Sequence, residues 1–448
     1  MTINASIDDQ QMLAPDINEP QVYKLTPLDG NPVSRANLQF VFFYALPHER
    51  HTEISRELRA SFYQTMRHYP ILYGRLDKNE NGYFCLVNQE YAQTKGLPRY
   101  EEHQVGTTLE EIRKSNYNWA VWPQELFSVP VSRTEDVPLV QCVVTWHADG
   151  FGVLFSVDHT IADGIGIDIL VNQWAGTVRG QPLKPADYNH ESFYRGLETE
   201  MQNDWFIDYV QSLETAGPVE GFVEGKCDPS VIEPALMANV HSMRITVEAL
   251  ERLRQDNMED TLEDRVSVIR LAYALMWQRY MAAKQQKSSS FLNVIHSGRH
   301  LVSRPNYIGN AVCPTYMSMP FEELMSSFAD VGRVIGKHMH QVKAPQWLAF
   351  SHKMLDSEWF AKFITVFANP TASQLTVSNI SRLNFYHADF GFGPPAYTTL
   401  YPVLIPGFST WMPLGPDGGI HILWNIPTNI FNRLKADTLF CKYIDIIY

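Results

Sequence analysis

One histidine stands where a side chain can do acid–base chemistry. His159 follows an apolar run, 153–157, which is typical of a buried strand. Asp163 comes four residues later, and Gly164 and Gly166 allow the backbone to turn sharply. An imidazole titrates near neutral pH, so at a strand end it can take a proton from a hydroxyl or an amine. We therefore expect His159 to act as a general base.

The His-x3-Asp spacing does not mark a site by itself, because His352 and Asp356 repeat it. This second copy has no apolar run before it and no glycine after it, and polar residues are mostly exposed. We interpret His352 as a surface residue. Without its flanks, His159 fits a hydrogen-bonded structural histidine as well as a catalytic one.

The elements that must position His159 follow from the apolar pattern. Strands are expected at 38–46, 83–87 and 137–146, and a helix at 53–67. A second helix should follow Gly166, with one apolar face formed by Ile167, Leu170, Val171, Trp174 and Val178. Later in the chain we expect strands at 241–245, 290–296, 314–320 and 418–424, and helices at 247–258 and 264–283.

The length of 448 residues exceeds one ordinary core, so two domains are expected. We predict a flexible tail at 1–20 and a first domain at 21–185. Residues 186–235 are rich in proline and glycine and should form a crossover segment, interrupted by a helix near 191–214. The second domain should span 236–448.

Composition excludes several classes of function. The net charge is −13 and no lysine or arginine cluster is visible, so nucleic-acid binding is not expected. The longest apolar runs are too short to span a membrane, and the N-terminus lacks the basic residues of a targeting segment. The five cysteines are scattered, which indicates neither a disulfide framework nor a metal cluster. A cytoplasmic protein without a metal is expected.

Further segments occur in the order found in a known enzyme family. They are LTPLD at 25–29, YPILYGRL at 69–76, PLVQ at 138–141, DGFG at 149–152, HTIADG at 159–164, the segment 267–277, YIGNAV at 307–312 and DFGFG at 389–393. This set resembles the BAHD acyltransferases, coenzyme A-dependent enzymes with H-x-x-x-D-G and D-F-G-W-G motifs. The chain departs from the second motif at Phe392, which replaces a tryptophan but keeps an aromatic ring.

The resemblance implies a fold and a reaction. The fold would be α+β, with two similar chloramphenicol-acetyltransferase-like domains, each a mixed β-sheet with flanking helices, and an active-site tunnel between them. The reaction would move an acyl group from acyl-CoA, as a co-substrate, to a hydroxyl or amine of a small molecule of secondary metabolism. It would proceed in a ternary complex, without a permanently bound cofactor, in a monomer.

The resemblance also implies roles for residues around His159. Asp163 would turn away from the histidine and pair with Arg299, which fixes the loop that carries His159. Gly164 would support the same loop. A second structural loop would be formed by Asp389, Gly391 and Gly393.

Substrate contacts are implied in the second half of the chain. Ser267 and Ser297 match positions that bind coenzyme A, although Ser267 could equally serve as a helix N-cap. Ser378 and Ile380 match the acceptor pocket, where relatives usually carry a tryptophan in place of Ile380. Phe42 is expected on the acceptor side as well.

Several alternatives stay open. The acyl group could be acetyl, a longer aliphatic chain or hydroxycinnamoyl, and the acceptor atom could be oxygen or nitrogen. The donor could instead be a carrier-protein pantetheine, although related condensation domains carry a doubled histidine and this chain has Asp158. The tunnel could also bind a small molecule, or catalyse a cyclisation or elimination with His159 as the base.

Overall fold

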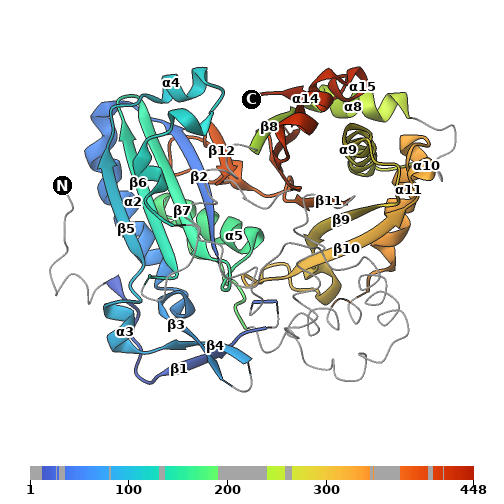
Figure 1. Ribbon diagram of the computed structural model, residues 1–448. Helices are drawn as coiled ribbons and strands as arrows, with labels where there is room; N and C mark the ends of the chain where they lie inside the picture. The colour runs from blue at the N-terminus through green and yellow to red at the C-terminus, as the bar shows by residue number, and fades with distance from the viewer. Residues whose placement is uncertain are drawn as a thin grey trace. The chain divides into compact units, whose positions relative to one another are not determined.

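The computed structural model describes residues 13–26, 28–29, 36–79, 82–130, 137–189, 240–257, 265–343, 347, 374–401, 407–416 and 418–448 (Figure 1). The chain divides into two compact units, which are described separately. The first unit comprises 1–196, 302–311 and 383–401, and the second comprises 197–301, 312–382 and 402–448. The predicted helix at 191–214, most of the crossover segment and the pair His352 and Asp356 lie outside the described residues.

The first unit contains a five-stranded and a three-stranded sheet. Its strands are β1 (Gln21–Lys24), β2 (Asn37–Ala45), β3 (Arg75–Asn79), β4 (Gly82–Val87), β5 (Arg99–Gln104), β6 (Val140–His147), β7 (Gly150–Asp158) and β12 (Tyr397–Leu400). Its α-helices are α2 (His51–Met66), α3 (Gln89–Gln93), α4 (Leu109–Lys114) and α5 (Gly164–Val178). Short 3-10 turns include η5 (Gln124–Phe127) and η8 (Phe385–His387).

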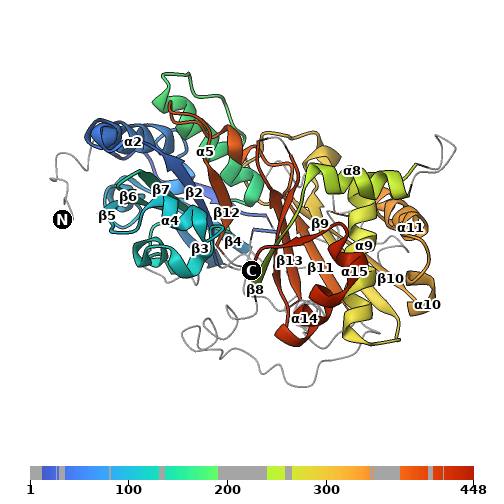
Figure 2. The same cartoon turned by 90° about the horizontal axis from the view of Figure 1, so that it is seen from above.

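The five-stranded sheet has the order β12-β2-β7-β6-β5. Its strands are antiparallel except for β5 and β6, which run parallel. Helices α2 and α5 cover one face of this sheet, as Figure 2 shows, and the indole nitrogen of Trp174 in α5 donates to the Leu58 carbonyl of α2 at 3.1 Å. The other face packs against α4 and η5. Because both faces are covered, every residue of β6 and β7 is buried.

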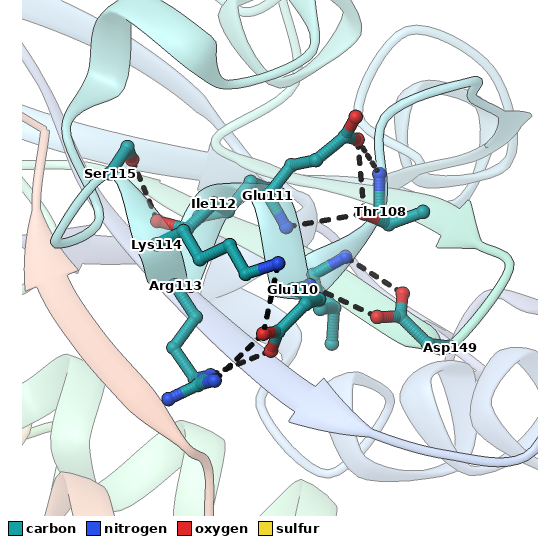
Figure 3. A network of polar contacts seen from close by, with 9 residues as sticks. Thr108, Glu110, Glu111, Ile112, Arg113, Lys114, Ser115 and Asp149 are labelled. Carbon is teal, nitrogen blue, oxygen red and sulfur yellow. Dashed lines mark hydrogen bonds and ion pairs between the residues drawn. The ribbon is translucent and has the colours of Figure 1, made fainter.

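A polar network fixes α4 to the hairpin between β6 and β7 (Figure 3). Thr108 and Glu111 form a capping box at the helix start. Asp149, in the hairpin turn, accepts hydrogen bonds from the amides of Leu109 and Glu110 at 2.7 and 3.0 Å. The next residue must be glycine, because a Cβ at Gly150 would lie 2.1 Å from the Tyr44 carbonyl oxygen. These contacts explain why the DGFG segment begins with Asp149 and Gly150.

The second unit is built on a seven-stranded sheet with the order β10-β9-β11-β13-β14-β8-β15. Its strands are β8 (Val240–Ile245), β9 (Ser290–Ser297), β10 (Val312–Met319), β11 (Gln374–Asn379), β13 (Phe408–Pro413), β14 (Ile420–Asn425) and β15 (Asp445–Ile446). Its helices are α8 (Val247–Asp256), α9 (Val268–Lys284), α10 (Phe321–Leu324), α11 (Phe328–Gln341), α14 (Thr428–Ala436) and α15 (Thr438–Cys441). Strand β11 runs parallel to both β9 and β13, so this sheet is mixed too.

Helix α9 is the centre of the second core. Its side chains pack with those of α8, α11 and α14 on one face of the sheet, and Trp277, Trp411 and Trp424 are fully buried there. Burial of such large aromatic side chains is the main contribution to the stability of this unit. Mixed sheets with flanking helices in both units confirm the predicted α+β fold class.

The predicted division of the chain differs from the observed units in two places. Two late segments, 302–311 and 383–401, belong to the first unit, because β12 pairs with β2. Within the predicted tail, Ala14 and Ile17 are buried, and the Ile17 amide donates to the Gln89 side chain at 2.6 Å. The domain limits otherwise stay a prediction.

Candidate active site

His159 directly follows the last residue of β7. Its backbone amide donates to the Ala36 carbonyl at 2.8 Å, and its carbonyl accepts from the Asn310 side chain at 2.6 Å. The ring nitrogen Nδ1 is buried and has no hydrogen-bond partner within the described structure. The backbone at His159 is thus held on both sides, while no carboxylate orients the ring through Nδ1.

Asp163 is the N-cap of α5 and is only 3% exposed. Its Oδ1 accepts from the amides of Ile165 and Gly166, both at 3.0 Å. Its Oδ2 accepts from the amide of Ala311 at 3.0 Å. The carboxylate therefore stabilises the start of α5 and ties the segment 302–311 to the histidine loop.

Asp29 and Asn310 complete the support of this loop. Both are fully buried. The Asn310 side chain donates to Asp29 at 2.8 Å as well as to the His159 carbonyl, and Asp29 also accepts from the amide of Thr26 at 2.8 Å. Sequence analysis found both residues within the LTPLD and YIGNAV segments but assigned neither a role. No local signal pointed to their pairing, because the two residues are 281 positions apart in the sequence.

The glycine that the loop needs is Gly166. A Cβ at this position would lie 2.0 Å from the Ile308 carbonyl oxygen, so α5 can approach the segment 302–311 only with glycine here. Gly164, the predicted support, is the first residue of α5 and is half-buried. Its supporting role stays a prediction.

The DFGFG loop is held by one carboxylate oxygen. Oδ1 of Asp389 accepts from the amides of Gly391, Phe392 and Gly393 at 2.7, 3.0 and 2.9 Å. Gly391 and Gly393 have φ values of 97° and 103°, which favour glycine. The loop is thus a compact turn that requires both glycines.

The contacts of the DFGFG loop place it at the far end of β7 from His159. The Phe390 ring packs 4.6 Å from Trp174 and 5.3 Å from Tyr44. The Phe392 ring lies 5.8 Å from Phe151, near the first residue of β7. Since His159 follows the opposite end of that strand, about 26 Å of extended chain separates the two sites.

Arg299 and Ser297 lie together in the second unit. Ser297 ends β9 and is half-buried, and its hydroxyl accepts from the amide of Arg299 at 3.3 Å. Arg299 is 3% exposed. Asp163 belongs to the first unit and Arg299 to the second, and their predicted pairing stays a prediction.

Ser267 is the N-cap of α9, and its side chain makes no capping hydrogen bond. The residue is exposed, so the hydroxyl and the first amides of this long helix face solvent. Arg270 lies one turn into α9, and its guanidinium is 3.4 Å from the ring of His340 in α11. A helix N-terminus beside a guanidinium suits an anion.

Ser378 and Ile380 lie at the end of β11. Ser378 pairs with Ile295 of β9 and with Thr410 of β13, and its side chain is half-buried. The amide of Ile380 donates to the Trp411 carbonyl at 2.8 Å, which extends the parallel ladder by one bond. Both residues therefore sit on a fixed strand end of the second unit.

Phe42, expected on the acceptor side from the sequence, is buried in the first unit, and its acceptor role stays a prediction. Its side chain is 1% exposed, and its ring packs 5.6 Å from that of Phe385. Phe40 packs on the same ring at 4.5 Å. Alternation along β2 puts these rings on the face that α5 and η8 cover, so Phe42 contributes to the core of the first unit.

The described part of the chain contains no metal-binding cluster, no disulfide and no membrane-spanning helix. It contains no group of three or more His, Cys, Asp or Glu that could hold a metal ion. Cys85, Cys142, Cys313 and Cys441 are free thiols, and Cys227 lies outside the described residues. No described helix is long and apolar enough to cross a membrane.

Comparison with known proteins identifies the family of this chain. The model of the Transferase family matches residues 5–431. The chain belongs to this family, the BAHD acyltransferases. The predicted resemblance is therefore confirmed over almost the whole chain.

BAHD relatives and neighbours agree with this assignment. The 3'-N-debenzoyl-2'-deoxytaxol N-benzoyltransferase of Taxus canadensis is 24% identical over 454 residues, which cover 97% of this chain and 96% of the relative. Acylsugar acyltransferase 3 of Solanum lycopersicum is 22% identical over 399 residues, covering 87% of this chain and 85% of the relative. F. graminearum TRI101, solved with coenzyme A and T-2 mycotoxin, has a TM-score of 0.79 at 15% identity, covering 96% of this chain and 100% of TRI101. The last comparison shows that the BAHD fold is shared.

Proposed function

We propose that this protein transfers an acyl group from an acyl-CoA thioester to a hydroxyl or amine of a small molecule. The observation that carries the proposal is His159, whose backbone is anchored on both sides at a strand end while its Nδ1 has no hydrogen-bond partner in the described part of the chain. Family membership supports the reaction class. The relatives include an N-benzoyltransferase and an acylsugar acyltransferase, and TRI101 was solved with coenzyme A.

His159 acts as general base and then as general acid. Its imidazole takes the proton of the acceptor hydroxyl or amine as the heteroatom attacks the thioester carbonyl. The tetrahedral intermediate collapses by cleavage of the carbon–sulfur bond, and the imidazolium returns the proton to the departing thiolate. Atoms and charge balance without an acyl-enzyme intermediate. Removal of such a base commonly lowers the rate by about 10²- to 10⁴-fold.

The second unit supplies the proposed binding residues for coenzyme A. Ser267 and the amides at the start of α9 would receive a phosphate, and Arg270 would add a positive charge beside them. Ser297 would contact the same substrate. The phosphates of coenzyme A need positive charge nearby. This local cluster would supply it in a protein whose net charge is −13.

Ser378 and Ile380 are the proposed acceptor contacts, and Asp163 and Arg299 the proposed positioning pair. Ile380 can neither stack nor donate a side-chain hydrogen bond, so the Ser378 hydroxyl is the polar group at that strand end. The cytoplasmic location and the monomeric state stay predictions.

Thiol release with a panel of acyl-CoAs and pooled alcohols and amines tests the proposal. Acceptor-dependent release, with a matching mass gain in the product, is expected for the wild type and should fall at least about 10²-fold in His159→Ala. An Arg270→Ala variant should raise the KM for acyl-CoA while the KM for the acceptor stays unchanged.

Other outcomes would redirect the proposal. Turnover of a small molecule without thiol release would mean proton-transfer chemistry in place of acyl transfer. Activity only with an acylated carrier protein would assign the donor to pantetheine on a protein. Equal thiol release by wild type and His159→Ala would contradict the role of the histidine.

A further inference from the structure

One face of the sheet of the second unit packs into the core around α9, and the other face carries both polar and apolar side chains. Val294 and Val377 lie opposite each other in β9 and β11 and point into the core around α9. Side chains alternate along strands, so the neighbouring residues Asn293, Thr376 and Ser378 lie on the opposite face. That face also carries the apolar side chains of Phe291 and Ile295, so its polar side chains lie between apolar neighbours.

Four of these side chains form a continuous row across β10, β9 and β11. The register places Tyr316 opposite Asn293 and Asn293 beside Thr376. The Asn293 side-chain nitrogen donates to the Tyr316 hydroxyl at 3.1 Å. The Gln374 side-chain nitrogen donates to the Thr376 hydroxyl at 3.0 Å. We call these four residues the polar row.

The polar row leaves two hydrogen-bond acceptors unsatisfied. Oδ1 of Asn293 and Oε1 of Gln374 are buried and have no hydrogen-bond partner among the residues that the structure describes. Asn293 is 0% and Gln374 5% exposed, so solvent does not satisfy them in this structure. A buried carbonyl oxygen without a donor is unfavourable and rare in folded proteins. An occupant that relieved this cost would have to bring hydroxyl or N–H donors.

The polar row continues the strand that carries the proposed acceptor contact. Ser378 lies two residues beyond Thr376 on the same face, a step of about 7 Å. Ser378 and the neighbouring Ile295 are half-buried, so the face is more open at this end than at the row. The row carries no formal charge, which favours a neutral occupant over a phosphate or a carboxylate.

We propose that the polar row binds hydroxyl groups of the acceptor other than the one that is acylated, and thereby selects polyols. This inference rests on the proposed function and names its acceptor class. The row offers two carbonyl oxygens that accept hydrogen bonds, beside the tyrosine and threonine hydroxyls. These groups suit an acyl-acceptor substrate that carries several O–H donors. The amides of pantetheine also carry donors, and the experiment below separates the two sources.

Matched acceptors test the selection. Octyl β-glucoside, used below its micelle concentration, and 1-octanol share an alkyl chain and differ in their number of hydroxyls. With the acyl-CoA that gives the fastest thiol release, the wild type should prefer the glucoside by at least about tenfold in kcat/KM, as two relieved acceptors imply. In Asn293→Leu and in Gln374→Met this preference should fall toward one through the KM for the glucoside, with the KM for acyl-CoA unchanged.

A matched control separates binding from folding. Gln278 is also a buried amide of this unit, but its nitrogen donates to the Ser326 carbonyl at 2.9 Å. Gln278→Met should lower Tm and leave the acceptor preference intact. The two row variants should keep Tm within about 2 °C of the wild type, because each removes an unsatisfied acceptor along with one hydrogen bond.

Calorimetric titration with octyl β-glucoside, without any acyl donor, keeps the two proposals distinguishable. Binding that is lost in the row variants supports the polar row even if no thiol release is ever seen. A raised KM for acyl-CoA with an unchanged acceptor preference would assign the row to pantetheine and overturn the inference. Absence of glucoside binding, or binding retained in both variants, would overturn it as well.

Discussion

The carboxylate of Asp163 accepts hydrogen bonds from three backbone amides, those of Ile165, Gly166 and Ala311. These bonds occupy both oxygens and fix two segments of the first unit. His159, four residues earlier, is held through its backbone, and its Nδ1 has no hydrogen-bond partner among the described residues. Asp163 therefore stabilises the fold, and the proposed chemistry is assigned to His159.

Variants of Asp163 and His159 should affect stability and turnover differently. Asp163→Ala leaves buried amides without an acceptor and should lower the free energy of unfolding by about 3 kcal/mol. His159→Ala should change it by less than about 1 kcal/mol while it lowers turnover at least about 10²-fold. Urea unfolding of both variants measures the difference. An Asp163→Ala protein as stable as the wild type would contradict the capping role.

The candidate site could be predicted from the sequence only where local signals existed. The strand before His159 and the glycines after it were enough to single out that residue. Asp29 and Asn310 had no such signal, because they meet across 281 residues of sequence. The acceptor role of Phe42 stays a prediction, and alternation along β2 did not reveal that α5 covers the face that carries this ring.

At the scale of elements, periodic apolar patterns predicted seven of the twelve strands in the two large sheets, together with α2, α5, α8 and α9, but not α11 or α14. The strand expected at 38–46 is β2, Asn37–Ala45, and the helix expected at 53–67 is α2, His51–Met66. The helix expected at 264–283 begins only at Val268. Its N-cap is Ser267, and the three residues before Val268 are not helical. Terminal residues carry little periodicity, so boundaries are the weakest part of such predictions.

Strands β11, β12 and β13 were not predicted. They are short, with four to six residues each, and their side chains are mostly polar or small on one face. Their strand character comes from pairing with distant partners such as β2 and β9. Local sequence contains no information about such pairings.

The close approach of α5 to the segment 302–311 depends on one glycine. Gly166→Ala would place a Cβ 2.0 Å from the Ile308 carbonyl, so we expect a loss of about 1–3 kcal/mol in the free energy of unfolding. Gly176→Ala in the same helix is the matched control. Its Cβ would meet only the flexible side chain of Gln181 at 3.2 Å, so stability should stay equal or rise slightly. Chemical denaturation compares the two.

At the scale of the whole molecule, buried histidines set the response to acid. Burial lowers the pKa of His296 and of His421 to about 4. Both are below the unfolded value of about 6.5, so the unfolded chain binds protons first as the pH falls. The stability that these neutral histidines contribute is present above pH 6.5 and is lost as the pH falls toward 4. Each shift corresponds to about 3 kcal/mol.

Asp168 acts in the opposite direction, because burial raises its pKa to about 6. Its protonated form stabilises the fold below about pH 4, and that contribution is lost as the pH rises through 6. Two histidines outweigh one aspartate, so unfolding free energy should fall between pH 6.5 and 4. His296→Gln and His421→Gln should each flatten this slope, and Asp168→Asn should steepen it. An unchanged slope in all three variants would refute the assignment.

The pairing of β12 with β2 also has a consequence for synthesis on the ribosome. Residues 397–400 complete the first sheet, yet they emerge after most of the second unit. Until then β2 is an unpaired edge that carries Phe40 and Phe42, which is a template for aggregation. A chaperone that binds extended aromatic segments would be needed most during this interval, and a chain that ends before residue 397 should accumulate as insoluble protein.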